Sequence, residues 1–195
     1  MSIRIQSPRE RIAALAAEVH TRFVDPDRID DVALTSGIVL VRNNGPIGRD
    51  AGFAHIHSVS APVYVESLAH PGELSRVWGR ETKRIVRSIA INPNAGIPER
   101  EIFWHEYYHL FYSPQGIQHS ERFAHAYSTE GVLHHQEERR ADEFASAVLV
   151  HPIEECDSMM EIAEKFGVSE RIAMCAFRFA RQLKMDRSER QALRI

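Results

Sequence analysis

Apolar residues recur every three or four positions in the first part of the chain, which is the spacing of one face of a helix. Ser7 and Pro8 are typical of a helix N-cap and first helical position. The apolar positions that follow are Ile12, Leu15, Ala16, Val19 and Phe23. The pattern predicts a helix over about residues 8–24, then a short helix closed by Gly37 and a strand over 38–41.

The next part of the chain contains short β-rich runs that favour strands. Turn-forming residues cluster over 43–50, and the runs 53–57 and 62–66 beyond them predict a hairpin. β-Branched residues over 85–91 predict a further strand before the break at Asn92 and Pro93. The sequence therefore predicts a small mixed or antiparallel sheet.

Helical patterns dominate the second half of the chain. Residues 99–112 predict a helix, and a second strong helix is expected over about 134–150, ended by Pro152. Gly116 and Gly131 lie in the polar segment between them. Residues 158–184 predict two helices joined by a turn at 167–169, the outline of a helix-turn-helix. We therefore predict an α+β fold, with a small sheet packed against two helices and a helical C-terminal segment.

The predicted helix over 99–112 carries the pattern HExxH at residues 105–109. On a helix His105 and His109 lie about 40° apart around the axis, so both rings can reach one metal ion. Glu106 lies about 100° from His105, which suits a general base better than a third ligand. Chance alone predicts roughly 0.06 such motifs in a chain of this composition.

A catalytic zinc ion needs three protein ligands and an open position for water. Glu138 and Asp142 are four residues apart on one face of the second strong helix. Glu138 is therefore the expected third ligand, and Asp142 the acceptor of the free ring N–H of a ligand histidine. Glu137 and Glu143 are the alternative ligands. The other interpretation is a solvated helix face with local ion pairs, and the HExxH motif favours the metal site.

Three further residues are candidates for stabilising a transition state. Tyr108 flanks the histidines and has a hydroxyl that can donate to an oxyanion, while His134 and His135 lie one turn before Glu138. Tyr107 is expected in the core. No role is predicted for His119, His125 and His151.

Composition narrows the class of protein. A chain of 195 residues with 44% hydrophobic content is long enough for one domain with its own core. The formal charge of -3 gives no long-range attraction to nucleic acid or anionic membrane. We find no signal peptide or membrane span and place the protein in the cytoplasm, where Cys156 and Cys175 are expected as buried thiols.

Two segments resemble the ImmA/IrrE-like metallopeptidases: HEYYHLFY and EERRADEFASAVLVHP. The resemblance extends to IAINP upstream and MEIAEKFGVSERIAMCAFRF downstream, and so covers about residues 85–183. It implies a gluzincin-like (zincin-type) fold, with Glu138 as the third zinc ligand, Asp142 beside it and Glu106 as the catalytic base. Tyr108, where a small residue is usual, and His151 before Pro152, in place of Met, depart from the pattern.

The resemblance implies site-specific cleavage of another protein, often a helix-turn-helix transcriptional repressor in stress response or mobile-element control. We therefore predict a zinc-dependent endopeptidase that acts on a specific intracellular protein, with Mn²⁺ and Fe²⁺ as alternatives to zinc. The metallopeptidase domain is expected over 1–155 and a helical C-terminal segment, packed on it, over 156–195.

The C-terminal segment supports an alternative class of function. Residues 171–195 contain seven Lys or Arg and two acidic residues, a composition that can contact phosphate or an acidic partner. Direct DNA binding is the less favoured interpretation, because base-reading residues are sparse at the start of the second helix. The alternative is therefore a non-catalytic, metal-containing regulatory protein that binds a partner protein or DNA through these helices.

Overall fold

The computed structural model describes residues 6–42, 51–66, 74–112, 129–153 and 158–192. The side chains of 57–66, 74–83, 129–134 and residue 190 are outside this description. The predicted turn over 43–50 and the residues Gly116, His119, His125 and Cys156 lie outside the described residues.

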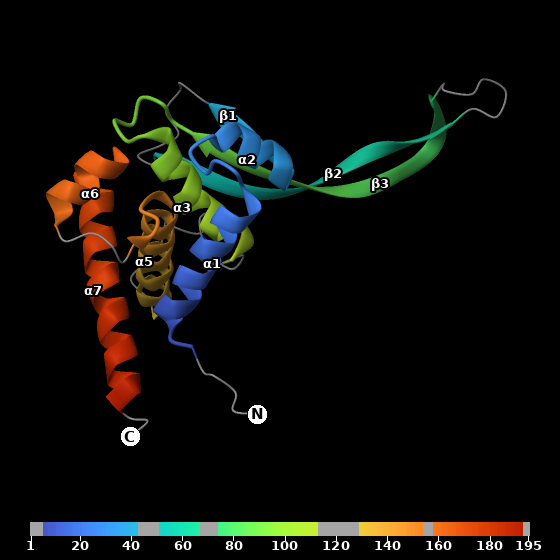
Figure 1. Cartoon of the computed structure of the whole chain (residues 1–195). Coiled ribbons are helices and arrows are strands. Elements are labelled where there is room, and N and C mark those ends of the chain that lie inside the picture. Colours follow the sequence, from blue (N-terminus) through green and yellow to red (C-terminus); the bar gives the residue numbers. More distant parts are fainter. Residues whose placement is uncertain (1–5, 43–50, 67–73, 113–128, 154–157, 193–195) are drawn as a thin grey trace.

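Three strands form one mixed sheet, as predicted. They are β1 (Ile38–Arg42), β2 (Gly52–Glu66) and β3 (Leu74–Ile91). Their order is β1-β3-β2, with β1 parallel and β2 antiparallel to β3. The predicted hairpin was wrong: the runs 53–57 and 62–66 belong to one strand, and β3 begins well before residue 85. The far part of this long β2–β3 hairpin projects away from the helices (Figure 1).

The position of Pro62 explains the error. Proline lacks an N–H and is usually read as a strand end, but an edge strand tolerates it. β2 is at the edge of this sheet, and Pro62 lies opposite Glu81 where the pairing register shifts. The strand therefore continues through the proline.

The first two helices confirm the predicted end signals. They are α1 (Pro8–Arg22) and α2 (Ile29–Ser36). Ser7 accepts a hydrogen bond from the backbone N–H of Glu10, whose carboxylate accepts one from the Ser7 N–H, so that both close a capping box. Gly37 ends α2 with φ of 66°, a left-handed conformation that suits glycine.

Four more helices complete the described fold. They are α3 (Glu99–Phe111), α5 (Thr129–Leu149), α6 (Met159–Phe166) and α7 (Glu170–Ala192). The helix α5 begins earlier, and α7 ends later, than the sequence predicted. Helix α5 packs against α1, α3 and α7, and α3 also contacts the sheet (Figure 1). The result is the predicted α+β fold with a helical C-terminus.

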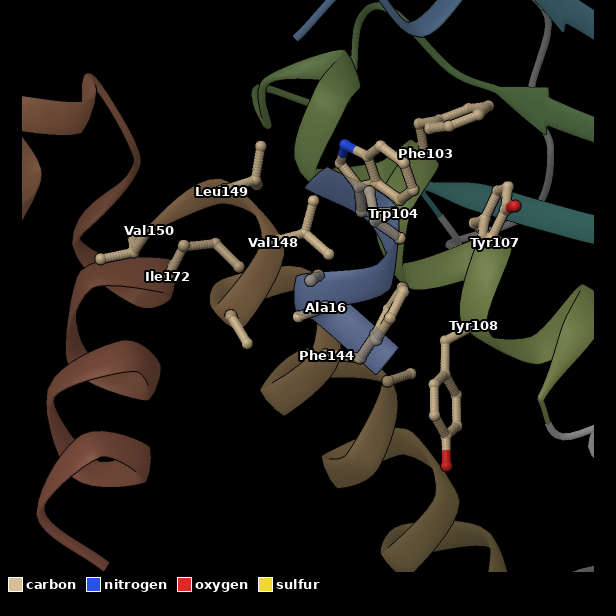
Figure 2. Close-up of a cluster of buried hydrophobic side chains, with 14 of the residues drawn as sticks. Ala16, Phe103, Trp104, Tyr107, Tyr108, Phe144, Val148, Leu149, Val150 and Ile172 are labelled. Carbon is tan, nitrogen blue, oxygen red and sulfur yellow. The ribbon is translucent and has the colours of Figure 1, made fainter. Parts of the chain in front are cut away.

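An aromatic cluster fixes α3 against α5. Phe144 of α5 is fully buried, and its ring lies 6.2 Å from Trp104 and 5.5 Å from Tyr108 of α3 (Figure 2). Burying a side chain of this size contributes about 1.5–3 kcal/mol. The cluster therefore sets the spacing of the two helices whose polar faces carry the candidate ligands. Among the described helices, none is long and apolar enough to cross a membrane.

Candidate metal centre

Helix α3 separates an apolar face from a polar one. Phe103, Trp104 and Tyr107 are at most 1% exposed and face the core. Since His105 and His109 are one turn apart, their rings lie together on another side of the helix, with centroids 5.0 Å apart. Core packing of the aromatic face therefore turns both imidazoles toward α5.

Helix α5 supplies the acidic partners. Glu138 Oε2 lies 3.1 Å from His105 Nε2, and Glu138 Oε1 lies 3.2 Å from His109 Nε2. The two Nε2 atoms are themselves 3.2 Å apart. The His109 side chain is 9% exposed, whereas the Glu138 side chain is 39% exposed, so the group lies at the edge of the interior.

These three side chains can hold a metal ion. Their ligand atoms all lie within 4.8 Å of one another. A tetrahedral zinc ion about 2.1 Å from each ligand atom would hold such atoms about 3.4 Å apart. The observed separations of 3.1 to 3.2 Å are close to that value. The donor set, two imidazoles and one carboxylate, is one that catalytic zinc sites use.

Asp142 sets the orientation of His105. Its Oδ1 atom accepts a hydrogen bond from His105 Nδ1 at 2.9 Å, since an ionised carboxylate can only accept. The Nε2 atom of His105 is thereby left to face the ligand group. The same Oδ1 atom accepts a second bond, of 2.7 Å, from Arg171 Nη1 of α7. The corresponding atom of His109, Nδ1, is buried and has no hydrogen-bond partner among the described residues.

The ligand group favours positive charge. Burial lowers the pKa of His105, but its bonds to Asp142 and Glu138 outweigh burial and raise that pKa to about 10. Burial raises the pKa of Glu138, yet its bonds to both histidines hold that value below the ordinary range. Burial likewise raises the pKa of Asp142, and its bonds to His105 and Arg171 hold it below the ordinary range. A proton on His105 therefore occupies a site suited to a cation.

The side chain of Glu106 extends from α3 toward the start of β2. The backbone N–H of Ala54 donates to its carboxylate, and a Cβ added at Gly52 would lie 3.2 Å from its Oε1 atom. Burial raises the pKa of Glu106, and the neighbouring His105 and His109 oppose that rise. Glu106 is thus a buried carboxyl beside the ligand group, and the absence of a side chain at Gly52 leaves space for its carboxylate.

The alternative ligands lie apart from the group. Glu137 pairs with Arg140, and Glu143, which is 6% exposed, has its Oε1 atom 3.7 Å from Arg139 Nε. Burial raises the pKa of Glu143. Of the three candidate ligands on α5, namely Glu137, Glu138 and Glu143, only Glu138 belongs to the ligand group.

The candidates for transition-state stabilisation receive less support. Tyr108 is 6% exposed and packs between His109 and Phe144, with its hydroxyl directed away from Trp104 (Figure 2). Burial raises the pKa of that hydroxyl, which is therefore neutral at pH 7. His135 is exposed, and the His134 side chain is outside the described residues. Their roles stay predictions.

Three neighbours of the site escaped the sequence analysis. They are Gly52 and Ala54 of β2 and Arg171 of α7. Gly52, next to the predicted strand over 53–57, carried a signal, since glycine at a strand often marks a close backbone approach. Arg171 carried none, because its partner Asp142 is 29 residues away on another helix.

Comparison with protein-family models, with curated proteins and with solved structures finds no match to the chain. The function of the chain is therefore inferred from the geometry of the site.

Proposed function

We propose that this chain is a zinc-dependent endopeptidase that cleaves another protein. The observation that carries the proposal is the convergence of His105, His109 and Glu138, with the buried carboxyl of Glu106 beside them. A purely structural zinc site is usually closed by four protein ligands. Among the described residues the group has three, which leaves a position for water.

Glu106 would act as the general base. Zinc, when bound, polarises the scissile carbonyl and lowers the pKa of the attacking water. Glu106 accepts the proton of that water and delivers it to the leaving amine, so that the proton is conserved over the reaction. Burial raises the pKa of Glu106, which makes its carboxylate a stronger base than that of an exposed glutamate.

The edge of β2 supports a peptide substrate. The Ala54 N–H donates to Glu106 and so points away from β3, toward the site. Among the described residues, β2 pairs only with β3, so its other edge has no strand partner there, although the Ala54 N–H on that edge is already bonded to Glu106. An extended segment of a substrate protein can pair with such an edge. The resemblance to ImmA/IrrE-like metallopeptidases supports a transcriptional repressor as the substrate.

The regulatory alternative has less support from the C-terminal helices. Ile172, Phe179 and Leu183 of α7 are at most 1% exposed and belong to the core. The helix is therefore committed to packing along that face, which favours the interpretation that it completes the fold.

Cleavage of a peptide library derived from cellular protein, followed by mass spectrometry, tests the proposal. We expect the zinc-loaded native chain to cut a defined set of peptides, and Glu106→Gln to bind zinc but cut them at least about 100-fold more slowly. Glu99→Gln, on the same helix but outside the site, is the matched control. Equal cleavage by Glu106→Gln would refute the assigned base, and a native chain that binds zinc but cuts nothing would favour the regulatory alternative.

A further inference from the structure

One oxygen atom joins α7 to the ligand group. Asp142 Oδ1 lies 2.7 Å from Arg171 Nη1 and 2.9 Å from His105 Nδ1. A short chain of charge-assisted hydrogen bonds therefore runs from α7 through α5 to α3. The Asp142 side chain is 33% exposed and that of Arg171 is 47% exposed, so water competes for both.

The start of α7 is held in place independently of this contact. Glu101 of α3 is fully buried, and its two carboxylate oxygens accept 2.7 Å bonds from the backbone N–H and the hydroxyl of Ser169. The Ser169 hydroxyl in turn accepts a bond from the Ile172 N–H and caps the helix. Arg171 is two residues beyond this anchor, so its backbone position is fixed relative to the HExxH helix.

We propose that Arg171 is a positioning residue of the metal centre. It holds the Asp142 carboxylate where it accepts the Nδ1–H of His105, so that the Nε2 lone pair of His105 faces the metal. The C-terminal helices are then part of the centre, and the inference depends on the metal site of the proposed function. Outer partners of this kind fix the tautomer and the ring orientation of a ligand histidine.

Two effects of Arg171 oppose each other. Its positive charge disfavours a nearby cation, while its hydrogen bond restricts a carboxylate that could otherwise turn toward water. Because half of the Arg171 side chain is exposed, solvent and salt screen the repulsion. The hydrogen bond acts at 2.7 Å through Asp142 and is lost outright when the guanidinium is removed. The orienting effect therefore outweighs the repulsion, and loss of Arg171 weakens zinc binding.

The test is the zinc dissociation constant of the full chain, measured by competition with a chromophoric chelator at one pH. Arg171→Ala is expected to weaken binding about fivefold, the scale of a partly exposed ion pair. Arg171→Lys, which keeps a donor and the charge, is expected to recover most of that loss. Arg178→Ala, exposed two turns further along α7, is the matched control and should bind zinc as the native chain does.

A second pair of variants separates positioning from general stability. Asp142→Ala is expected to weaken zinc binding about 10–100-fold. If Arg171 acts through Asp142, then adding Arg171→Ala to Asp142→Ala weakens binding no further. The inference is overturned if Arg171→Ala weakens zinc binding fivefold both in the native chain and in Asp142→Ala, and also lowers the stability of the metal-free chain to a matching extent. Arg171 would then have a purely structural role.

The outcomes distinguish this inference from the proposed function. Tight zinc binding by Arg171→Ala, equal to or stronger than native, overturns the inference and leaves the peptidase proposal intact. A fivefold loss that vanishes without Asp142 supports the inference even if the native chain cuts no peptide. Failure of the native chain to bind zinc overturns both.

Discussion

Gly52 is the position where β2 comes closest to the HExxH helix. A Cβ added there would lie 2.2 Å from Ile102 Cγ2 and 3.1 Å from Glu106 Cγ. Carbon atoms in contact prefer separations of about 3.5–4.0 Å, so Gly52→Ala must move strand and helix apart by about 1 Å. Ile102 is 4% exposed and cannot turn into solvent. Gly52 is not among the described glycines with positive φ, so backbone strain plays no part.

The expected losses of stability and of cleavage rate in Gly52→Ala follow from this overlap. Overpacking of a core typically destabilises by about 1–3 kcal/mol, and a shift of about 1 Å in a catalytic group can slow a reaction about 100-fold. Urea unfolding measures the first quantity and peptide cleavage the second, while zinc content should stay native. Ile102→Leu, which removes the offending methyl at nearly constant volume, should restore part of both losses. Native stability and native cleavage in Gly52→Ala would refute the close approach.

Three further predictions concern the core, the charge of the site and the anchor of α7. Phe144→Ala should lower the free energy of unfolding by about 3–5 kcal/mol in urea, because the ring is fully buried; a loss below about 1 kcal/mol would contradict its place in the core. Zinc binding at pH 7 should release a proton, since the pKa of His105 is raised to about 10 and a ligand ring must lose its Nε2 proton. The apparent affinity for zinc should therefore rise with pH up to about 10. Calorimetry in buffers of different ionisation enthalpy counts the protons released on zinc binding, and a count of zero would contradict this prediction. Glu101→Gln should cost about 1–3 kcal/mol of stability through its bonds to Ser169 while zinc content stays native, and loss of zinc would contradict a separate anchor.

The sequence predicted those parts of the site that depend on local geometry. The four-residue spacing of His105 and His109, and of Glu138 and Asp142, places each pair on one face of a helix whatever the rest of the fold does. The structure brings the first three of these side chains together, and Asp142 bonds to His105 as expected. The helix ends at Ser7 and Gly37 were equally local and carry the predicted caps, and the predicted turn at 167–169 begins with Gly167 at the end of α6.

Features that depend on contacts between distant segments were not predictable in this way. The extent of the hairpin was missed because Pro62 suggests a strand end, and only the pairing with β3 shows that the strand continues. Arg171 and Gly52 acquire their importance from α5 and α3, which lie far away in the sequence. The division at residue 155 and the roles of His134 and His135 stay predictions.

The most direct test of the account is the zinc content of purified protein, measured by elemental analysis after reconstitution. Glu138→Ala and Glu137→Ala change neighbouring carboxylates on one helix, and only Glu138 belongs to the ligand group. We predict one equivalent of zinc in the native chain and in Glu137→Ala, and little or none in folded Glu138→Ala. Zinc retained by Glu138→Ala, or absent from the native chain, would contradict the metal centre on which the proposed function depends.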